Sequence, residues 1–245
     1  MRYWSALDII NQVSAEVGLA RVQTLFDAND VQEVQSSQLL AALQAAGNAL
    51  VQFYPWEQFK KEWVFTLVAG QGSYPLPDDW DYFIDQTQWD RTNHWPLMGP
   101  KNPAEWAWLK GGLIASFPRI RYRVMNNNFE VFPVPTSDTK FEFAMEYVST
   151  DWVQGANSPD QKPNQAMVKA DGDVVWFHPW LIIKYTKLKW LQLKNFPTDS
   201  AAADFQRMWD ATLGKDVGAP VLSLVPKQTP FFIGPYSIPD SNWSV

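Results

Sequence analysis

The stretch LLAALQAAGNALVQF, residues 39–53, decides the fold of this chain. Its apolar side chains recur at alternating steps of four and three residues, a spacing that places them on one face of an α-helix. The members of this stripe are Leu39, Leu43, Ala46, Leu50 and Phe53. Such a stripe needs another helix to cover it. We therefore expect a helix that begins near Asn29 or Asp30, ends before Pro55, and packs against other helices.

Three further stretches show the same helical periodicity. The first begins after Ser5, whose side chain can cap residues 6–17, and Gly18 is a natural stop. The other two cover residues 173–196 and about 198–213. Because two amphipathic helices stand at each end of the chain, the sequence predicts one four-helix bundle that both ends form together.

The residues between these helices are typical of β structure. The clearest signal is a hairpin of residues 119–125 and 129–135 around three asparagines at 126–128, since asparagine tolerates the positive φ of tight loops. Apolar runs and alternation predict further strands over 63–68 and 140–149. The predicted fold class is therefore α+β, with an antiparallel β domain inserted into the four-helix bundle.

The expected domain boundaries follow from these patterns. Residues 1–60 and 173–218 are the two halves of the bundle, residues 61–172 are the inserted β domain, and residues 219–245 are an extended C-terminal arm. The arm contains five prolines, which exclude a helix: Pro220, Pro226, Pro230, Pro235 and Pro239. Its apolar anchors are Phe231, Phe232, Tyr236 and Trp243. Exposing such anchors to water is costly, so we expect the arm to dock on another protein chain rather than fold back over its own bundle.

Composition excludes several classes of function. The chain has 245 residues, a formal net charge of −6 and no cysteine, which removes disulfides, zinc–thiolate sites and cysteine nucleophiles. Its two histidines, His94 and His178, stand too far apart for a local metal motif. No apolar run approaches the roughly 20 residues of a membrane span. We expect no catalytic residue, no metal or cofactor, and no contact with a membrane.

An acidic and tryptophan-rich segment, residues 78–95, leaves one enzymatic alternative open. Its carboxylates could bind a cation or act as the paired acids of a glycoside hydrolase: Asp78, Asp79, Asp81, Asp85 and Asp90. Its tryptophans Trp80, Trp89 and Trp95 could stack on sugar rings. A solvated or interface-facing loop is the favoured interpretation, because the ligand spacing of a calcium loop is missing. A carbohydrate-binding or carbohydrate-active domain is the alternative function.

Two groups of basic residues could contact phosphates or acidic partners. One alternates along a predicted strand and the other follows a predicted helix: Arg119, Arg121 and Arg123, and Lys184, Lys187 and Lys194. For the strand we favour ion pairs with Glu130, and with Glu142 or Glu146 beyond it. For the helix, a solvated face is the usual meaning, although such a stripe could meet an acidic partner in an assembly.

A family resemblance emerges from a longer succession of motifs. The run YPLPDDWDYFIDQTQWDRT at 74–92 is followed by WPLMGP at 95–100 and by a short predicted helix at 103–110. Together with Tyr54-Pro55-Trp56 upstream, this succession resembles the head-to-tail adaptors of short-tailed bacteriophages, the tail tubular protein A type. The resemblance extends over about residues 5–215 in organisation and is specific mainly across 54–110.

The resemblance implies a non-enzymatic ring protein of the virion neck and tail, present in the host cytoplasm before assembly. Twelve copies would sit beneath the dodecameric portal protein, close the head and seat the tail nozzle protein, with tail fibres as further possible partners. DNA would pass through the channel without specific binding. The aromatic excess, with 14 Trp and 15 Phe, suits such interfaces. The candidate assembly residues are Trp80, Trp89, Trp95, Trp106, Phe231, Phe232, Tyr236 and Trp243.

Overall fold

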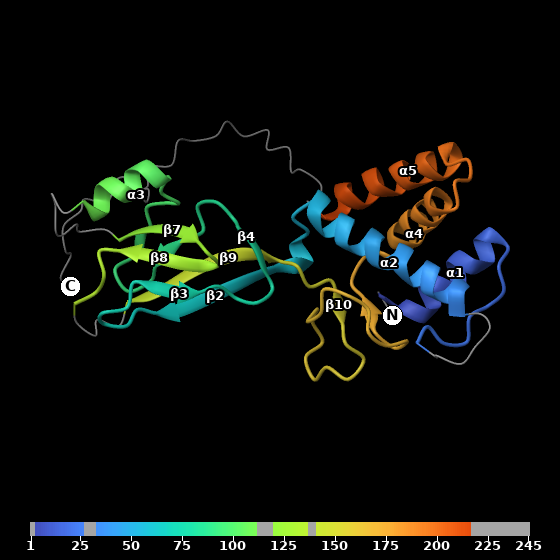
Figure 1. Cartoon of the computed structure of the whole chain (residues 1–245), viewed down its shortest axis with the longest axis horizontal. Helices are drawn as coiled ribbons and strands as arrows, with labels where there is room; N and C mark the ends of the chain where they lie inside the picture. The colour runs from blue at the N-terminus through green and yellow to red at the C-terminus, as the bar shows by residue number, and fades with distance from the viewer. Residues whose placement is uncertain (1–2, 27–32, 112–119, 137–140, 217–245) are drawn as a thin grey trace, which may run out of the picture. The chain divides into compact units, whose positions relative to one another are not determined.

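The computed structural model describes residues 3–26, 33–111, 120–136 and 141–216 (Figure 1). These residues fall into two compact units: 3–60 with 149–216, called here the helical unit, and 61–148, called here the sheet unit. The fold is mixed α+β, with five α-helices in the described residues and antiparallel strand pairing, which confirms the expected class. The arm with Phe231, Phe232, Tyr236 and Trp243 lies outside the described residues.

The helical unit contains four α-helices. They are α1 (Ala6–Val17), α2 (Glu33–Phe53), α4 (Pro179–Leu193) and α5 (Asp199–Asp216). The short 3₁₀ segment η1 (Glu57–Phe59) follows α2. The predicted start and stop of α1 are confirmed: the Ser5 hydroxyl oxygen accepts a hydrogen bond from the Asp8 backbone N–H at 3.1 Å, and Gly18 has a φ of 74°.

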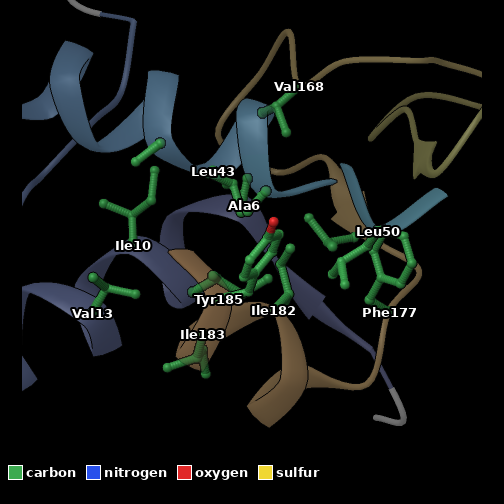
Figure 2. Close-up of a cluster of buried hydrophobic side chains, with 14 of the residues drawn as sticks. Ala6, Ile10, Val13, Leu43, Leu50, Val168, Phe177, Ile182, Ile183 and Tyr185 are labelled. Atoms are coloured by element: carbon green, nitrogen blue, oxygen red, sulfur yellow. The ribbon is translucent and has the colours of Figure 1, made fainter. Parts of the chain in front are cut away.

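Helix α4 is the central element of this unit, because it contacts α1, α2 and α5. Ile182, Ile183 and Tyr185 of α4 lie among side chains from α1 and α2 (Figure 2). Leu43 of α2 and Ile10 of α1 are fully buried in the same cluster. A helix that is apolar on most sides has to be surrounded in this way. In the apolar stripe quoted first, Leu39, Leu43, Ala46 and Leu50 are fully buried, whereas Phe53 at its end is 55 % exposed. The helix that packs against this stripe, α4, lies more than a hundred residues away in sequence.

The helix expected from residue 173 begins later than predicted. Val174–Val175 instead form strand β11, which pairs with β1 (Trp4–Ser5) on one side and with β10 (Val153–Gln154) on the other. The Asp173 carboxylate accepts hydrogen bonds from the backbone N–H groups of Ala156, Lys169 and Ala170, and so holds the preceding chain in a non-helical path. Helix α4 then starts at Pro179, where the missing N–H costs nothing.

Residues 149–172, placed by their sequence pattern in the inserted domain, make their contacts with the helical unit. The Trp152 side chain is fully buried, and its indole N–H donates to Asn48 Oδ1 at 2.9 Å. Gly47 of α2 makes room for this ring, since a Cβ there would lie 2.4 Å from a Trp152 ring carbon. The Gln44 side chain also donates to the Val168 carbonyl at 3.2 Å.

The sheet unit is built from short antiparallel strands. One sheet has the order β2 (Lys60–Thr66), β9 (Glu142–Ser149), β5 (Trp89–Asp90) and β6 (Trp95–Pro96), and β4 (Trp80–Phe83) also pairs with β9. The other has the order β3 (Ser73–Pro75), β8 (Asn128–Phe132) and β7 (Arg121–Met125). The predicted hairpin is confirmed as β7 and β8, and Asn126 and Asn127 have positive φ angles of 51° and 57°.

The core of the sheet unit is aromatic and centres on Phe129. This fully buried ring lies within 6 Å, centroid to centroid, of Trp63, Phe65, Phe83 and Tyr122. Edge-to-face geometry dominates these contacts, and only the Tyr122 ring is stacked on Phe129. Helix α3 (Pro103–Lys110) belongs to this unit, and Asn102 caps it by accepting from the Glu105 N–H at 2.8 Å.

Candidate interaction surfaces

The four candidate tryptophans of the sheet unit have different environments. Trp80 on β4, Trp89 on β5 and Trp95 on β6 are half-buried, whereas Trp106 on α3 is only 3 % exposed. Trp108, which the sequence pattern did not single out, is 56 % exposed. Helical periodicity could have found it: if Trp106 and Leu109 face inward, position 108 faces outward.

The strand register separates Trp89 from Trp95. Across the β5–β6 pair, Trp89 is opposite Pro96 and Asp90 is opposite Trp95. Directly opposed residues share a face of the ribbon and successive residues alternate, so the two tryptophans lie on opposite faces. They do not form one platform on which a sugar could stack. The carbohydrate alternative therefore gains no support from this geometry.

The acidic residues nearby are used in local structure. Asp79 accepts hydrogen bonds from Lys61 Nζ at 2.6 Å and from the Tyr147 hydroxyl at 3.0 Å. Asp90 is 4 % exposed and caps the following turn, accepting from the backbone N–H groups of Thr92 and Asn93 at 2.9 and 3.1 Å. Within the described ranges, no group of three His, Asp or Glu side chains is arranged to hold a metal ion.

A pocket of about 550 Å³ opens between β4 and β7. Its lining includes aromatic side chains and three charged groups, namely Trp80, Tyr82, Tyr122, Asp85, Lys101 and Arg123. We call it the Tyr122 pocket. The backbone of the chain just before Lys101 closes over Tyr122, because a Cβ at Gly99 would lie 2.6 Å from the Tyr122 carbonyl oxygen.

Tyr122 lies between this pocket and the aromatic core of the sheet unit. Its side chain is 2 % exposed and stacks on Phe129 at a centroid distance of 4.8 Å. Burial, reinforced by the nearby Asp85 carboxylate, raises the pKa of Tyr122 well above its usual range, so the hydroxyl stays protonated. The Trp80 indole N–H is buried without a partner among the described residues.

The lysine stripe of α4 is largely satisfied inside the helical unit. Lys184 and Lys187 each place Nζ 3.0 Å from Glu16 Oε2 on α1. Burial alone would raise the pKa of Glu16, but the hydrogen bonds and charges of the two lysines outweigh it and lower this pKa below its ordinary value. Lys194 donates to Gln38 Oε1 on α2. These partners lie 156 to 171 positions away, so sequence spacing could not reveal them.

Two of the three arginines of the predicted strand, Arg121 and Arg123, lie on β7. Arg123 is directly opposite Glu130 in the β7–β8 register, which places the two side chains on one face; the ion pair between them stays a prediction. Glu142, the other expected acid, instead lies 3.6 Å from Arg91, which also pairs with Glu62. Arg119 lies outside the described residues.

Exposed apolar side chains gather where α4 ends. Leu193 and Phe196 are 63 % and 52 % exposed. The Lys194–Gln38 hydrogen bond brings this corner to the first turns of α2, where Val34 is 68 % exposed.

In the part of the chain that the structure describes, no helix has the length and apolarity needed to cross a bilayer.

Exposed large apolar side chains on each unit, such as Trp108 and Leu193, are typical of surfaces at which protein chains contact one another. The chain belongs to the SU10 adaptor protein family, whose family model matches residues 5–223. Adaptors of this family act at the virion neck, where they interact with portal and tail components, and are generally non-enzymatic. No curated protein matches the chain. The expected adaptor class is therefore confirmed.

Proposed function

We propose that this protein is the ring-forming head-to-tail adaptor of a short-tailed phage, of the tail tubular protein A type. Twelve copies assemble beneath the dodecameric portal protein, close the DNA-filled head and seat the tail nozzle protein. The protein waits in the host cytoplasm until the portal is available. The observation that carries the proposal is the family match, which runs through both units, from residue 5 to residue 223.

The proposal assigns different roles to the parts of the chain. The four helices of the helical unit act as one four-helix bundle, a rigid body that both chain ends complete. The sheet unit presents contact surfaces such as Trp108, and the arm at 219–245 reaches a neighbouring subunit or the portal. Large aromatic side chains that are exposed on one chain are typical anchors of protein interfaces.

The channel of the ring is acidic and lets DNA slide. Each copy has a formal net charge of −6, and Glu16 holds the basic groups of Lys184 and Lys187 within the helical unit. A surface of this sign repels phosphates. Duplex DNA should therefore show no retention by the assembled ring at physiological salt, and a salt-dependent DNA complex would contradict this part of the proposal.

The decisive experiment is reconstitution with the portal protein of the same phage. Full-length protein is mixed with purified portal and imaged by electron microscopy. We expect a second ring of twelve copies, roughly 340 kDa for the 28.1 kDa chain, stacked coaxially on the portal. The full-length protein without portal is the control. Portal particles that gain no added density would overturn the proposal.

A further inference from the structure

One outer face of the sheet unit is acidic. On β2 and β9, side chains that point into the aromatic core alternate with side chains that point away from it, as the period of two in a strand requires. Three exposed carboxylates of these strands point away from the core, those of Glu62, Glu142 and Glu146. The Arg91 guanidinium pairs with Glu62 and lies 3.6 Å from Glu142. Because three carboxylates outnumber one guanidinium, we call this surface the acidic face.

A hollow of about 400 Å³ opens in the acidic face. Its lining includes Glu62, Glu146 and Ala144, together with the half-buried Trp89, which is directly opposite Ala144 in the β5–β9 register. An aromatic ring beside carboxylates attracts a lysine ammonium or an arginine guanidinium, through cation–π interaction and ion pairing. The hollow therefore suits a basic side chain of another protein chain.

The opposite outer face of the sheet unit is formed by β7, β8 and α3. Tyr122 of β7 belongs to the aromatic core, so Arg121 and Arg123 point away from it. Helix α3 packs on that outer side, because its Trp106 ring lies 6.3 Å from the ring of Phe132, which is directly opposite Arg121. Figure 1 shows α3 at the upper border of the sheet unit and β2 at the lower border.

This second face is basic. Four cations are distributed over α3, β7 and the chain before α3, namely Lys101, Lys110, Arg121 and Arg123. Three carboxylates accompany them, those of Glu105, Glu130 and Asp85. Trp108 on α3 is 56 % exposed and adds a large apolar contact area. Aromatic and arginine side chains are enriched where protein chains meet. We call this surface the basic face.

The two faces are complementary in charge and lie on opposite sides of one core. Each face can therefore contact the other face of an identical neighbour, which is the heterologous contact that a closed ring requires. We propose that the basic face of one copy docks on the acidic face of the next copy around the ring, with a basic side chain in the hollow beside Trp89. The inference rests on the proposed ring, because the ring provides the next copy.

Charge reversal tests this contact in the full-length protein assembled on the portal. Lys110→Glu and Glu146→Lys each place like charges across the contact. Each should lower the fraction of portal particles with a complete second ring at least about tenfold. Both positions are exposed, and thermal unfolding of each variant checks that the fold is retained. Lys162→Glu, at an exposed position of the helical unit, is the matched control and should assemble like the parent protein.

Cross-linking tests which surface the basic face meets, and the absence of cysteine makes it direct. One preparation contains Ala107→Cys at an exposed position of α3, and a second, tagged preparation contains Val64→Cys on the acidic face, where Val64 is 42 % exposed. The two are mixed, with and without portal, and treated with a short bis-maleimide. Docking should raise the yield of the mixed cross-linked dimer about tenfold over a control in which Met167→Cys replaces Val64→Cys. Met167 is 49 % exposed and belongs to the helical unit.

The outcomes separate this inference from the proposed function. If rings form on the portal but the mixed dimer does not exceed the Met167→Cys control, or both charge reversals assemble like the parent protein, the inference is overturned while the ring stands. A ring that retains duplex DNA and loses it with Lys110→Glu would place the basic face in the channel and also overturn docking. If the mixed dimer forms in free protein but no ring forms on the portal, docking is supported and the proposed function fails. Neither a ring nor a mixed dimer would overturn both.

Discussion

The helical unit is assembled from two distant parts of the chain, whereas the described residues of the sheet unit all come from one stretch, 61–148. The helical core is mainly aliphatic and surrounds one central helix, α4. The core of the sheet unit is a cluster of aromatic rings around Phe129. Long-range burial holds the first unit together, and ring contacts between short strands hold the second. The sheet unit also has the open Tyr122 pocket and the exposed Trp108, so the two units differ in their available contact surfaces.

The largest expected effect on stability tests whether the two cores unfold independently of each other. Phe129→Ala removes a fully buried ring with four aromatic neighbours and should destabilise the sheet unit by about 3–5 kcal/mol. Hydrogen exchange read by mass spectrometry should show lost protection in residues 61–148 only. Phe59→Ala, at a fully buried position of the helical unit, is the matched control and should give the opposite pattern. Equal loss in both units for either variant would mean that the chain unfolds as one cooperative body.

A smaller effect tests how tightly the long-range helical core is packed. Gly47→Ala places a methyl group against the Trp152 ring and should destabilise the helical unit by about 1–3 kcal/mol. Gly214→Ala on α5 meets nothing within 4 Å and should stabilise it by about 0.5–1 kcal/mol. Thermal unfolding of both variants provides the comparison. A neutral or stabilising Gly47→Ala would show that Trp152 has room to move.

The next effect concerns the ion pair between the two distant parts of the helical unit. Glu16→Gln removes the charge shared by Lys184 and Lys187 and should cost about 1 kcal/mol at neutral pH. Because the pKa of Glu16 is lowered in the folded protein, the stability it contributes is present above the unfolded pKa and is lost as pH falls through the folded value.

Urea unfolding at about pH 7 and about pH 3 measures this difference. The parent protein and Glu16→Gln should differ in the free energy of unfolding at the higher pH and converge at the lower one. A difference of the same size at both values would assign the effect to packing of the side chain instead of its charge.

The smallest effect on stability should fall on the exposed tryptophan of the sheet unit. Trp108→Ala changes a side chain that is 56 % exposed and should alter the free energy of unfolding by no more than about 0.5 kcal/mol. It should nevertheless reduce the amount of protein that assembles on the portal. Trp106→Ala, two positions away and 3 % exposed, should do the reverse and destabilise the fold first. If Trp108→Ala assembles like the parent protein, α3 does not contribute to the interface.

Local signals in the sequence were sufficient where the structure depends on neighbouring residues. Ser5, Gly18 and the asparagine loop at 126–128 act through their own backbone conformation, and each predicted its helix end or turn. Local signals failed at Val174–Val175, where the residues have a pattern compatible with a helix but form a strand. Its partners Trp4–Ser5 and Val153–Gln154 come from elsewhere in the chain, and no local rule records them.

The candidate interaction residues were predictable only in part, for the same physical reason. The segment 78–110 was singled out by composition, yet burial of Trp106 and exposure of Trp108 depend on how α3 packs. The Tyr122 pocket is formed by β4, β7 and the chain around Lys101, which are separated in sequence.

The central position of α4 also sets an order of events during synthesis on the ribosome. Helices α1 and α2 emerge first, but their apolar faces have no cover until α4 has been translated. The whole sheet unit emerges in between, and it can fold while the first two helices wait for on the order of ten seconds. The nascent chain therefore presents a finished sheet unit beside two uncovered helices. That interval is when the protein is most exposed to chaperones and to pairing with other nascent copies.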